Sequence, residues 1–584
     1  MTKDQLKKRI DIAAGRKVAD AVIKNAKVVD VFGGAIIEGD IAISDGFIAG
    51  VGQYEGLVTY DAKGCYAAPG FIDSHIHIES SYVTPEEIGK LLTPCGTTTI
   101  VADPHEIVNV KGLQGIAYML EAAEKTALDV KYMVPSCVPA TPFEHAGGAI
   151  KAQDIKEALK NKKILGLAEF MDYPSVINAT DFALERLLAA HEAGVHIDGH
   201  APRVSGNALN AYVTAGISSD HECTTVEEMR DKISCGMYIF MRHGSACHDL
   251  ERLLAGVTPQ NSSRCLLCSD DRQPKTIFEE GHLDYHLRVC VRKGIDPVAA
   301  ICMATLNAAE CFGMHDRGAI APGRRADIVL LEDLSEFRVA QVFILGDKVA
   351  DSGRYLRDVE RMDSPASNAK TSHMKSSFHV KDFSIEKLKL ALKCDKVHTI
   401  ELMPGGILTK KSVARIKLDA TGDFVRDDNE DIVKVAVVER HQSTGNVAVA
   451  LLKGYGIRAG AVALSIAHDS HNIITAGTTD EDIAFAVKAL IEQNGGIVLV
   501  KDGAVLESMP MPIGGIMTDQ SGEWVDKKLT SIHEIAHKEL GISGTVEPVM
   551  TLCFMSLPVI PEIKLTDMGL FDVTKFDFIA VEAE

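Results

Sequence analysis

The segment GFIDSHIHIE, residues 70–79, decides the fold, because an apolar run typical of a buried strand ends there in histidines and a glutamate. Seven further runs have the same form, each ending in polar or charged residues and most followed by a helical stretch. Repeated strand-then-helix order implies a parallel sheet. The seven runs are TTTIVADPHE (97–106), KYMVPSCVP (131–139), ILGLAEFMD (164–172), VHIDGHAP (195–202), GISSDHEC (216–223), MYIFMRHGSA (237–246) and RCLLCSDDR (264–272).

Eight strand–helix units within about 250 residues are what a (β/α)8 barrel requires. We therefore predict an α/β fold with a TIM-like barrel over residues 69–317. An open, doubly wound sheet is the alternative. His, Glu and Asp residues cluster at the C-terminal ends of the predicted strands, where barrel enzymes place their active sites. The pattern thus predicts an active site at that rim.

The segments on either side of the barrel contain short β-rich runs separated by glycine turns. We expect residues 1–68 and 318–361 to pair into one discontinuous small β-sandwich domain. Residues 362–378 are rich in Ser, Lys and Pro, which predicts a linker. Residues 379–584 mix strands and helices, which predicts a C-terminal α+β domain.

The composition is that of a globular protein whose partners are small molecules. The chain has 584 residues, 46% of them hydrophobic and 24% charged, which is enough apolar material for a sizeable core. Its formal net charge of −20 disfavours binding to nucleic acid or to an anionic membrane. The 13 cysteines lack disulfide spacing, and we find no signal-peptide or membrane-spanning run, so we expect a cytoplasmic protein.

Two histidines at the end of the first predicted strand indicate a metal site. His75 and His77 are two residues apart, so the alternation of a strand places both imidazoles on one face. This spacing alone is a weak signal, but further ligands end later strands and would converge on the same rim. A mixed histidine and carboxylate set suits Zn, Fe or Mn, and two such ions about 3.5 to 4 Å apart can share a bridging carboxylate. The further ligands are Glu169, His200, His221 and Asp270.

Six segments spread over the chain carry a resemblance: PGFIDSHIHIESS (69–81), ADPHEIVNV (102–110), GLAEFMD (166–172), SDDR (269–272), HQSTGN (441–446) and AHDSHN (467–472). Together they resemble the adenine deaminase family of the amidohydrolase superfamily. The resemblance implies a barrel flanked by a small β-sandwich, with two divalent ions held by the six residues named above. Mn2+ or Fe2+ is favoured, and Zn2+ stays open. Many relatives use a carboxylated lysine as the bridge, whereas here Glu169 stands on the fourth strand, and Lys162 and Lys163 precede that strand.

The resemblance also implies a reaction: hydrolysis of adenine to hypoxanthine and ammonia by a metal-activated hydroxide, in purine salvage. Asp270 is the expected catalytic residue, since a carboxylate beside that hydroxide can accept its proton and pass it to the departing amine. A helix N-cap is the alternative role for Asp270, and Asp271 could take either role. The alternative functions are another superfamily hydrolase, acting on a cyclic amide or an N-acetyl sugar, and a catalytically inactive scaffold. We expect a homo-oligomer, a dimer being the commonest form.

Three residues after the second strand, Asp103, His105 and Glu106, are expected to bind the substrate. A protonated glutamate or histidine there can donate a hydrogen bond to a purine ring nitrogen and make the attacked carbon more electrophilic. Binding of additional metal and simple capping of the loop are the alternatives.

Polar residues also follow two other predicted strands. Arg242 and His243 end the seventh strand, and ion pairing with nearby acids is the alternative to a role in the site. His468, Asp469 and His471 follow an apolar strand of the C-terminal region. They either reach over the barrel mouth or stabilise their own loop.

Overall fold

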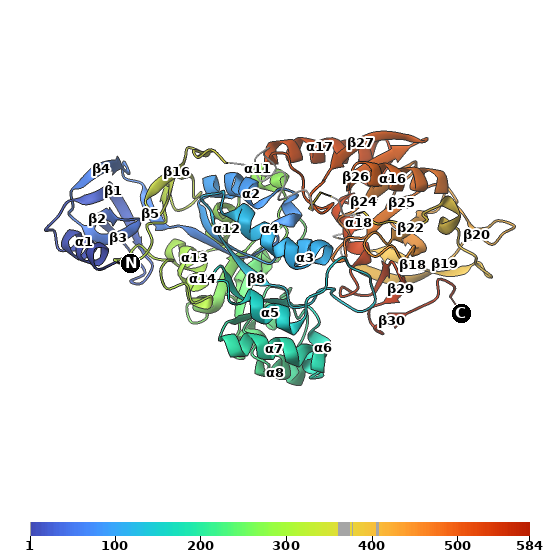
Figure 1. The fold of residues 1–584 in the computed structure, drawn as a ribbon, viewed down its shortest axis with the longest axis horizontal. Helices are drawn as coiled ribbons and strands as arrows, with labels where there is room; N and C mark the ends of the chain where they lie inside the picture. The colour runs from blue at the N-terminus through green and yellow to red at the C-terminus, as the bar shows by residue number, and fades with distance from the viewer. Residues whose placement is uncertain (1, 360–373, 376–377, 405–407, 584) are drawn as a thin grey trace.

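Figure 1 shows the fold in a computed structural model, which describes residues 2–359, 374–375, 378–404 and 408–583. The ribbon passes from a small β-rich lobe through a central α/β body to a C-terminal lobe of strands and helices. The predicted linker, 362–378, lies outside the described residues except for 374, 375 and 378. Among the described residues, no helix is long and apolar enough to cross a membrane.

Parallel strands form the central body. They pair in two sheets, one in the order β10-β9-β8-β7-β6 and one in the order β11-β12-β13. The sheets also meet at both edges: Ser218 N donates to Ile197 O (3.1 Å) between β10 and β11, and Asp270 N donates to His75 O (2.9 Å) between β13 and β6. The strands are β6 (Phe71–Ile76), β7 (Thr97–Ala102), β8 (Asp129–Val134), β9 (Ile164–Phe170), β10 (His196–Gly199), β11 (Ser219–Asp220), β12 (Tyr238–Arg242) and β13 (Cys265–Cys268).

These contacts close a ring of strands, so the body has the TIM-barrel type of architecture. The predicted α/β barrel is therefore confirmed as a type of architecture. An open sheet would lack the contact between its first and last strands. Every residue of β6, β7 and β13 is buried, as expected for parallel strands covered on both faces. Cys265 and Cys268 lie in β13 as core residues, and all 13 cysteines are free.

Helices connect the barrel strands, and threonine caps mark several of their starts. The Thr180 hydroxyl accepts a hydrogen bond from Ala183 N in α7, and Thr225 caps α9 in the same way. The helices are α2 (Pro85–Leu92), α3 (His105–Lys111), α4 (Leu113–Ala123), α5 (Ala152–Ala158), α6 (Tyr173–Ile177), α7 (Asp181–Ala193), α8 (Gly206–Thr214), α9 (Val226–Ser234), α10 (Leu250–Leu253), α11 (Pro274–Glu280), α12 (Leu283–Arg292), α13 (Pro297–Met303) and α14 (Leu306–Cys311).

The β-rich lobe joins strands from before and after the barrel. β14 pairs antiparallel with β5, with Ile328 opposite Pro69, and hydrogen bonds link nine strands into a single sheet beside α1 (Lys3–Ala13). The division of the chain at residues 68, 318 and 361 stays a prediction. The strands are β1 (Ala19–Asp30), β2 (Ala35–Ser44), β3 (Phe47–Gly52), β4 (Gly56–Asp61), β5 (Tyr66–Pro69), β14 (Ile328–Leu331), β15 (Val339–Ile344), β16 (Asp347–Asp351) and β17 (Arg354–Tyr355).

The C-terminal lobe is built on a mixed sheet in the order β19-β18-β23-β22-β25-β24-β26-β27. Its strands are β18 (Lys396–Leu402), β19 (Thr409–Arg415), β22 (Ile432–Val438), β23 (Val447–Lys453), β24 (Ala461–Leu464), β25 (Ile473–Gly477), β26 (Gly496–Lys501) and β27 (Ala504–Pro510). The lobe also contains α16 (Asp480–Glu492), α17 (Gly522–Lys538), α18 (Met550–Cys553), and the short strands β20 (Lys417–Leu418), β21 (Phe424–Val425), β28 (Ile563–Thr566), β29 (Gly569–Asp572) and β30 (Asp577–Phe578).

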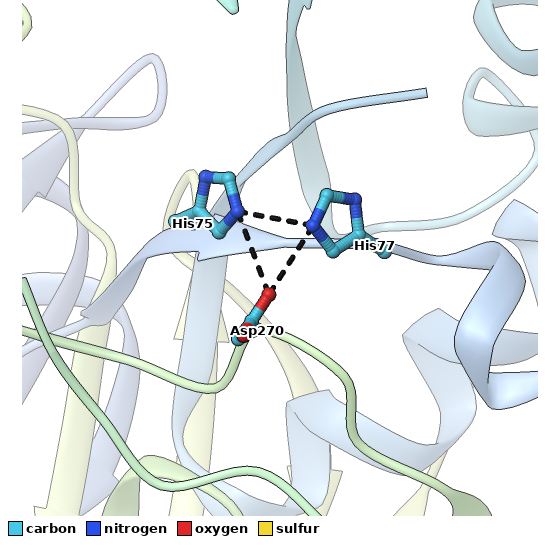
Figure 2. A group of neighbouring side chains, drawn as sticks. All are labelled: His75, His77 and Asp270. Carbon is cyan, nitrogen blue, oxygen red and sulfur yellow. Dashed lines mark hydrogen bonds and ion pairs between the residues drawn. The ribbon is translucent and has the colours of Figure 1, made fainter. Parts of the chain in front are cut away.

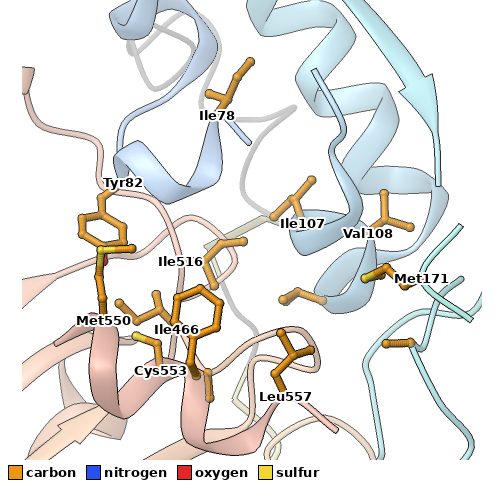
Figure 3. Packing of buried hydrophobic residues seen from close by; sticks show 14 of the residues in the cluster. Ile78, Tyr82, Ile107, Val108, Met171, Ile466, Ile516, Met550, Cys553 and Leu557 are labelled. Carbon is orange, nitrogen blue, oxygen red and sulfur yellow. The ribbon is translucent and has the colours of Figure 1, made fainter. Parts of the chain in front are cut away.

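One apolar core runs from the barrel into the C-terminal lobe. Figure 3 shows Ile78 and Ile107, which follow barrel strands β6 and β7, near Ile516, Met550 and Leu557 of the lobe. These five side chains are at most 5% exposed. Because residues just beyond the C-terminal ends of strands make this contact, the lobe lies over the barrel end that carries the predicted active site.

Candidate metal centre

The two histidines of β6 face one another across a small buried space. The Nε2 atoms of His75 and His77 are 3.1 Å apart, as the two-residue alternation of a strand predicts. Figure 2 shows both rings beside Asp270, whose Oδ1 lies 3.6 Å from His75 Nε2 and 3.2 Å from His77 Nε2. The three side chains form one group able to hold a metal ion.

Asp270 does not cap a helix. It follows β13 in a left-handed conformation, with φ 57°, and forms a parallel bridge with Ile76 of the first barrel strand. Helix α11 begins only at Pro274, with Gln273 at its N-cap position. The alternative N-cap role for Asp270 is therefore wrong, since its carboxylate is directed at the histidines instead.

Glu169 on β9 stands between two groups of histidines. Its Oε1 lies 3.3 Å from His77 Nε2 and 3.8 Å from His75 Nε2. Its Oε2 lies 2.7 Å from His200 Nδ1 and 3.4 Å from His221 Nε2. A carboxylate with one oxygen toward each group has the geometry of a bridging ligand.

The donor set fits divalent metal ions. All six expected ligands come together, and each residue is at most 7% exposed. Two imidazole nitrogens at 3.1 Å with two carboxylates around them suit a shared cation, because burying these carboxylates without a neutralising partner is costly. His75, Glu169 and His221 form a second buried group whose ligand atoms lie within 4.8 Å of one another.

The electrostatics of the site favour positive charge. Burial alone would lower the pKa of His75, but its contacts with Asp198 and Asp270 raise it to about 10. Burial likewise opposes protonation of His200, yet Glu222 and Glu169 raise its pKa to about 9. The same field that stabilises an imidazolium there stabilises a metal cation.

Sequence reasoning missed Asp198. It lies on β10 two residues before His200, and its Oδ2 is 3.3 Å from His75 Nδ1. Metal-binding histidines commonly donate their second ring N–H to such a carboxylate, which fixes the tautomer. The signal was present in VHIDGHAP, since residues two apart on a strand share a face.

Arg242 forms ion pairs with nearby acids, which was the expected alternative to a direct role in the site. Its Nη1 donates to Asp270 Oδ2 (3.1 Å), its Nε donates to Asp249 Oδ2 (3.0 Å), and its guanidinium also pairs with Glu222. The arginine therefore holds Oδ2 of Asp270, while Oδ1 of the same carboxylate faces His75 and His77. His243 is buried but pairs only weakly, at 3.9 Å from Glu280 Oε2.

Of the three residues expected to bind substrate, Asp103 and His105 lie beside the metal centre, whereas Glu106 lies toward the C-terminal lobe. His105 Nδ1 lies 3.4 Å from Asp103 Oδ2 and 3.5 Å from Glu169 Oε1, so it borders the metal centre. Glu106 accepts a hydrogen bond from Ser80 Oγ (3.0 Å) on the side toward the C-terminal lobe.

The C-terminal segment reaches the barrel mouth. Asp469 Oδ1 lies 3.8 Å from His105 Nε2, and His468 Nδ1 lies 3.3 Å from Glu106 Oε1. Of the two alternatives for these residues, the structure supports the one that places them over the mouth.

Fold and ligands together define the class of protein, a metal-dependent hydrolase of the amidohydrolase type. The model of the amidohydrolase family matches residues 66–349, and that of the adenine deaminase C-terminal domain matches residues 406–577. Adenine deaminase 2 of Desulfotalea psychrophila is 62% identical, and adenine deaminase of Ligilactobacillus salivarius is 52% identical, each over 100% of both chains. Adenine deaminase of Halalkalibacterium halodurans is 45% identical over 99% of this chain and 98% of its own. The chain belongs to the adenine deaminase family, hydrolases that act on C–N bonds.

Proposed function

We propose that this protein hydrolyses adenine to hypoxanthine and ammonia and serves purine salvage. The observation that carries the metal-dependent chemistry is the Glu169 carboxylate, whose oxygens face His77 on one side and His200 on the other. This arrangement supports a centre of two divalent ions, with Mn2+ or Fe2+ favoured and Zn2+ open. The similarity to adenine deaminases over the full chain supports adenine as the substrate. The cytoplasmic location and a homo-oligomeric state, such as a dimer, stay predictions.

The proposed ligands are His75, His77, Glu169, His200, His221 and Asp270. When bound, such ions lower the pKa of water toward neutrality and so supply a nucleophile at neutral pH. The protein's own contribution is to fix the ligands in position. Asp198 holds the ring of His75, and Arg242 holds Asp270.

Asp270 is the proposed proton carrier. Burial alone would raise its pKa, but the contacts with His75, His77 and Arg242 hold the pKa well below its usual value. The carboxylate is therefore ionised and can accept the proton of the attacking water. A carboxylic acid gives that proton up readily to the more basic departing amine, so that adenine and water become hypoxanthine and ammonia.

His105 and Asp103 are proposed to contact the purine. Both are buried beside the metal centre, and neither oxygen of Asp103 accepts a hydrogen bond from the described part of the chain. Unsatisfied buried acceptors are rare unless a ligand uses them. An N–H group of the purine would satisfy Asp103, and His105 would orient the ring next to the centre. Glu106, the third residue of the expected set, faces His468 instead.

A panel of substrates tests this function. The metal-reconstituted protein is assayed for ammonia release from adenine, adenosine, cytosine and guanine, and for opening of a cyclic amide. We expect ammonia from adenine in preference to the other three bases and nucleosides. Turnover of the cyclic amide without ammonia release from adenine would overturn the proposal.

A further inference from the structure

A second group of metal-ligand residues lies between the barrel mouth and the C-terminal lobe. Glu106 comes from α3 of the barrel, and His468 and His471 come from the segment after β24. One ligand atom from each residue lies within 4.8 Å of the others, and His468 Nδ1 is 3.3 Å from Glu106 Oε1. These three residues are separate from the six proposed ligands of the catalytic centre.

The two ring nitrogens of His471 lack hydrogen-bond partners in the described part of the chain. The residue is 1% exposed, and neither of its ring nitrogens makes a hydrogen bond with another described residue. A buried imidazole without a partner is costly, because it has lost its hydrogen bonds to water. Its two free nitrogens therefore point to a ligand that is not part of the chain.

The carboxyl groups nearby also lack enough donors. Ser80 Oγ lies 3.0 Å from Glu106 Oε1 and 2.5 Å from Asp271 Oδ1. A hydroxyl has one proton, so it can donate to only one of these oxygens at a time. Within the described part of the chain, Glu106 Oε1 has one further partner, His468 Nδ1 at 3.3 Å. Glu79 adds another buried carboxyl to the same cavity, so three carboxyl groups share few donors there.

The size of the cavity selects among ligands. Glu106, His468 and His471 line a cavity of about 10 Å³, which is room for about one water-sized group such as a single ion. Glu79 and Ser80 also line the cavity, and its remaining walls are the largely apolar side chains of Tyr82, Ile466, Ile516 and Met550 (Figure 3). Walls that exclude water strengthen the attraction between a cation and the carboxylate.

We propose that Glu106, His468 and His471 bind a divalent cation of their own, separate from the catalytic centre, which ties the C-terminal lobe to the barrel mouth. Two imidazoles and a carboxylate are a ligand set that Zn2+, Mn2+ and Fe2+ accept in proteins. The ion would hold Asp469, the neighbour of His468, against His105 at the catalytic mouth. The proposal does not depend on adenine being the substrate.

Counting bound metal tests the site directly. The full chain is stripped with a chelator, reconstituted with Mn2+, freed of unbound ions by gel filtration, and analysed for metal per chain. We expect Glu106→Gln and His471→Gln to hold one equivalent less than the wild-type protein. Glutamine keeps an oxygen to accept from Ser80, so Glu106→Gln preserves the local hydrogen bond. The two variants change separate elements, so each remains informative if the other fails to fold.

A histidine outside the cavity provides the matched control. His398 lies on β18, and its Nδ1 is 3.0 Å from Ala580 O, away from the cluster. We expect His398→Gln to retain the wild-type metal count. Wild-type counts in both Glu106→Gln and His471→Gln would overturn the proposal. The same conclusion would follow if His471→Gln raised KM for adenine without losing metal, because the cavity would then serve the substrate.

Discussion

Asp198→Asn tests how the protein prepares His75 to bind metal. Asp198 Oδ1 accepts hydrogen bonds from Ser219 Oγ (2.5 Å) and Gly199 N (2.9 Å), which leaves Oδ2 for His75 Nδ1 at 3.3 Å. A carboxylate can only accept, so Nδ1 of the neutral ring carries the hydrogen and Nε2 presents its lone pair to the metal centre. An asparagine would keep its oxygen on the two donors and turn its NH2 toward Nδ1, which favours the wrong tautomer.

The expected effect of Asp198→Asn is a loss of metal affinity of about 10- to 100-fold, or about 1.4 to 2.7 kcal/mol. Competition between the protein and a metallochromic chelator for Mn2+ measures this affinity. Ser219→Ala is the control, because it removes a donor from Oδ1 and leaves the contact of Oδ2 with His75. We expect a smaller loss there. If Asp198→Asn bound Mn2+ as tightly as the wild-type protein, Asp198 would not set the tautomer of His75.

Four further predictions concern the centre, the barrel and the lobe contact. Glu169→Gln should lose bound metal and activity together, because an amide offers only one acceptor oxygen; full metal content by elemental analysis would refute the bridge. Asp270→Asn should lower kcat about 10²- to 10⁴-fold while leaving the thermal unfolding midpoint near that of the wild-type protein. Although burial raises the pKa of Asp129, Arg317 lowers it from 3.8 to about 2. The depressed pKa gives about 2 kcal/mol of stability that is present above pH 4 and lost as the pH falls through about 2. Asp129→Asn should therefore lower the urea midpoint at pH 7 and converge with the wild-type protein near pH 2; an equal difference at both pH values would contradict this. Leu557→Ala should cost about 2 to 5 kcal/mol of stability and Leu557→Met less than about 1.5 kcal/mol, as measured by denaturant unfolding.

The rim of the barrel could be predicted because it follows from local patterns. The alternation of β6 fixes the shared face of His75 and His77, and parallel strands bring Glu169 and Asp270 to the same end. The sequence also predicted the position of His221 at a strand end, although β11 is only two residues long. The polar residues that end the segment GISSDHEC indicated it. Runs of β-rich sequence before and after the barrel led us to expect that these two segments pair, although the sequence did not specify which strands; in the structure β14 pairs with β5.

The remaining features depend on contacts between distant segments. The approach of Asp469 to His105 joins the C-terminal lobe to the second barrel strand, and no local periodicity encodes it. The role of Asp198 likewise depends on a contact between two strands, because its Oδ2 lies 3.3 Å from Nδ1 of His75 on β6. The sequence alone could not decide whether the Asp270 carboxylate caps a helix or faces the histidines. That choice depends on the bridge between Asp270, after the last barrel strand, and Ile76 of the first.

The most direct test of the central claim is the reaction of adenine with the metal-free protein before and after reconstitution with Mn2+, Fe2+ or Zn2+. Ammonia and hypoxanthine are both quantified. The account predicts one ammonia and one hypoxanthine for each adenine consumed by the reconstituted protein, and negligible turnover by the metal-free protein. Equal deamination in both states, or no hypoxanthine with any of the three metals, would contradict it.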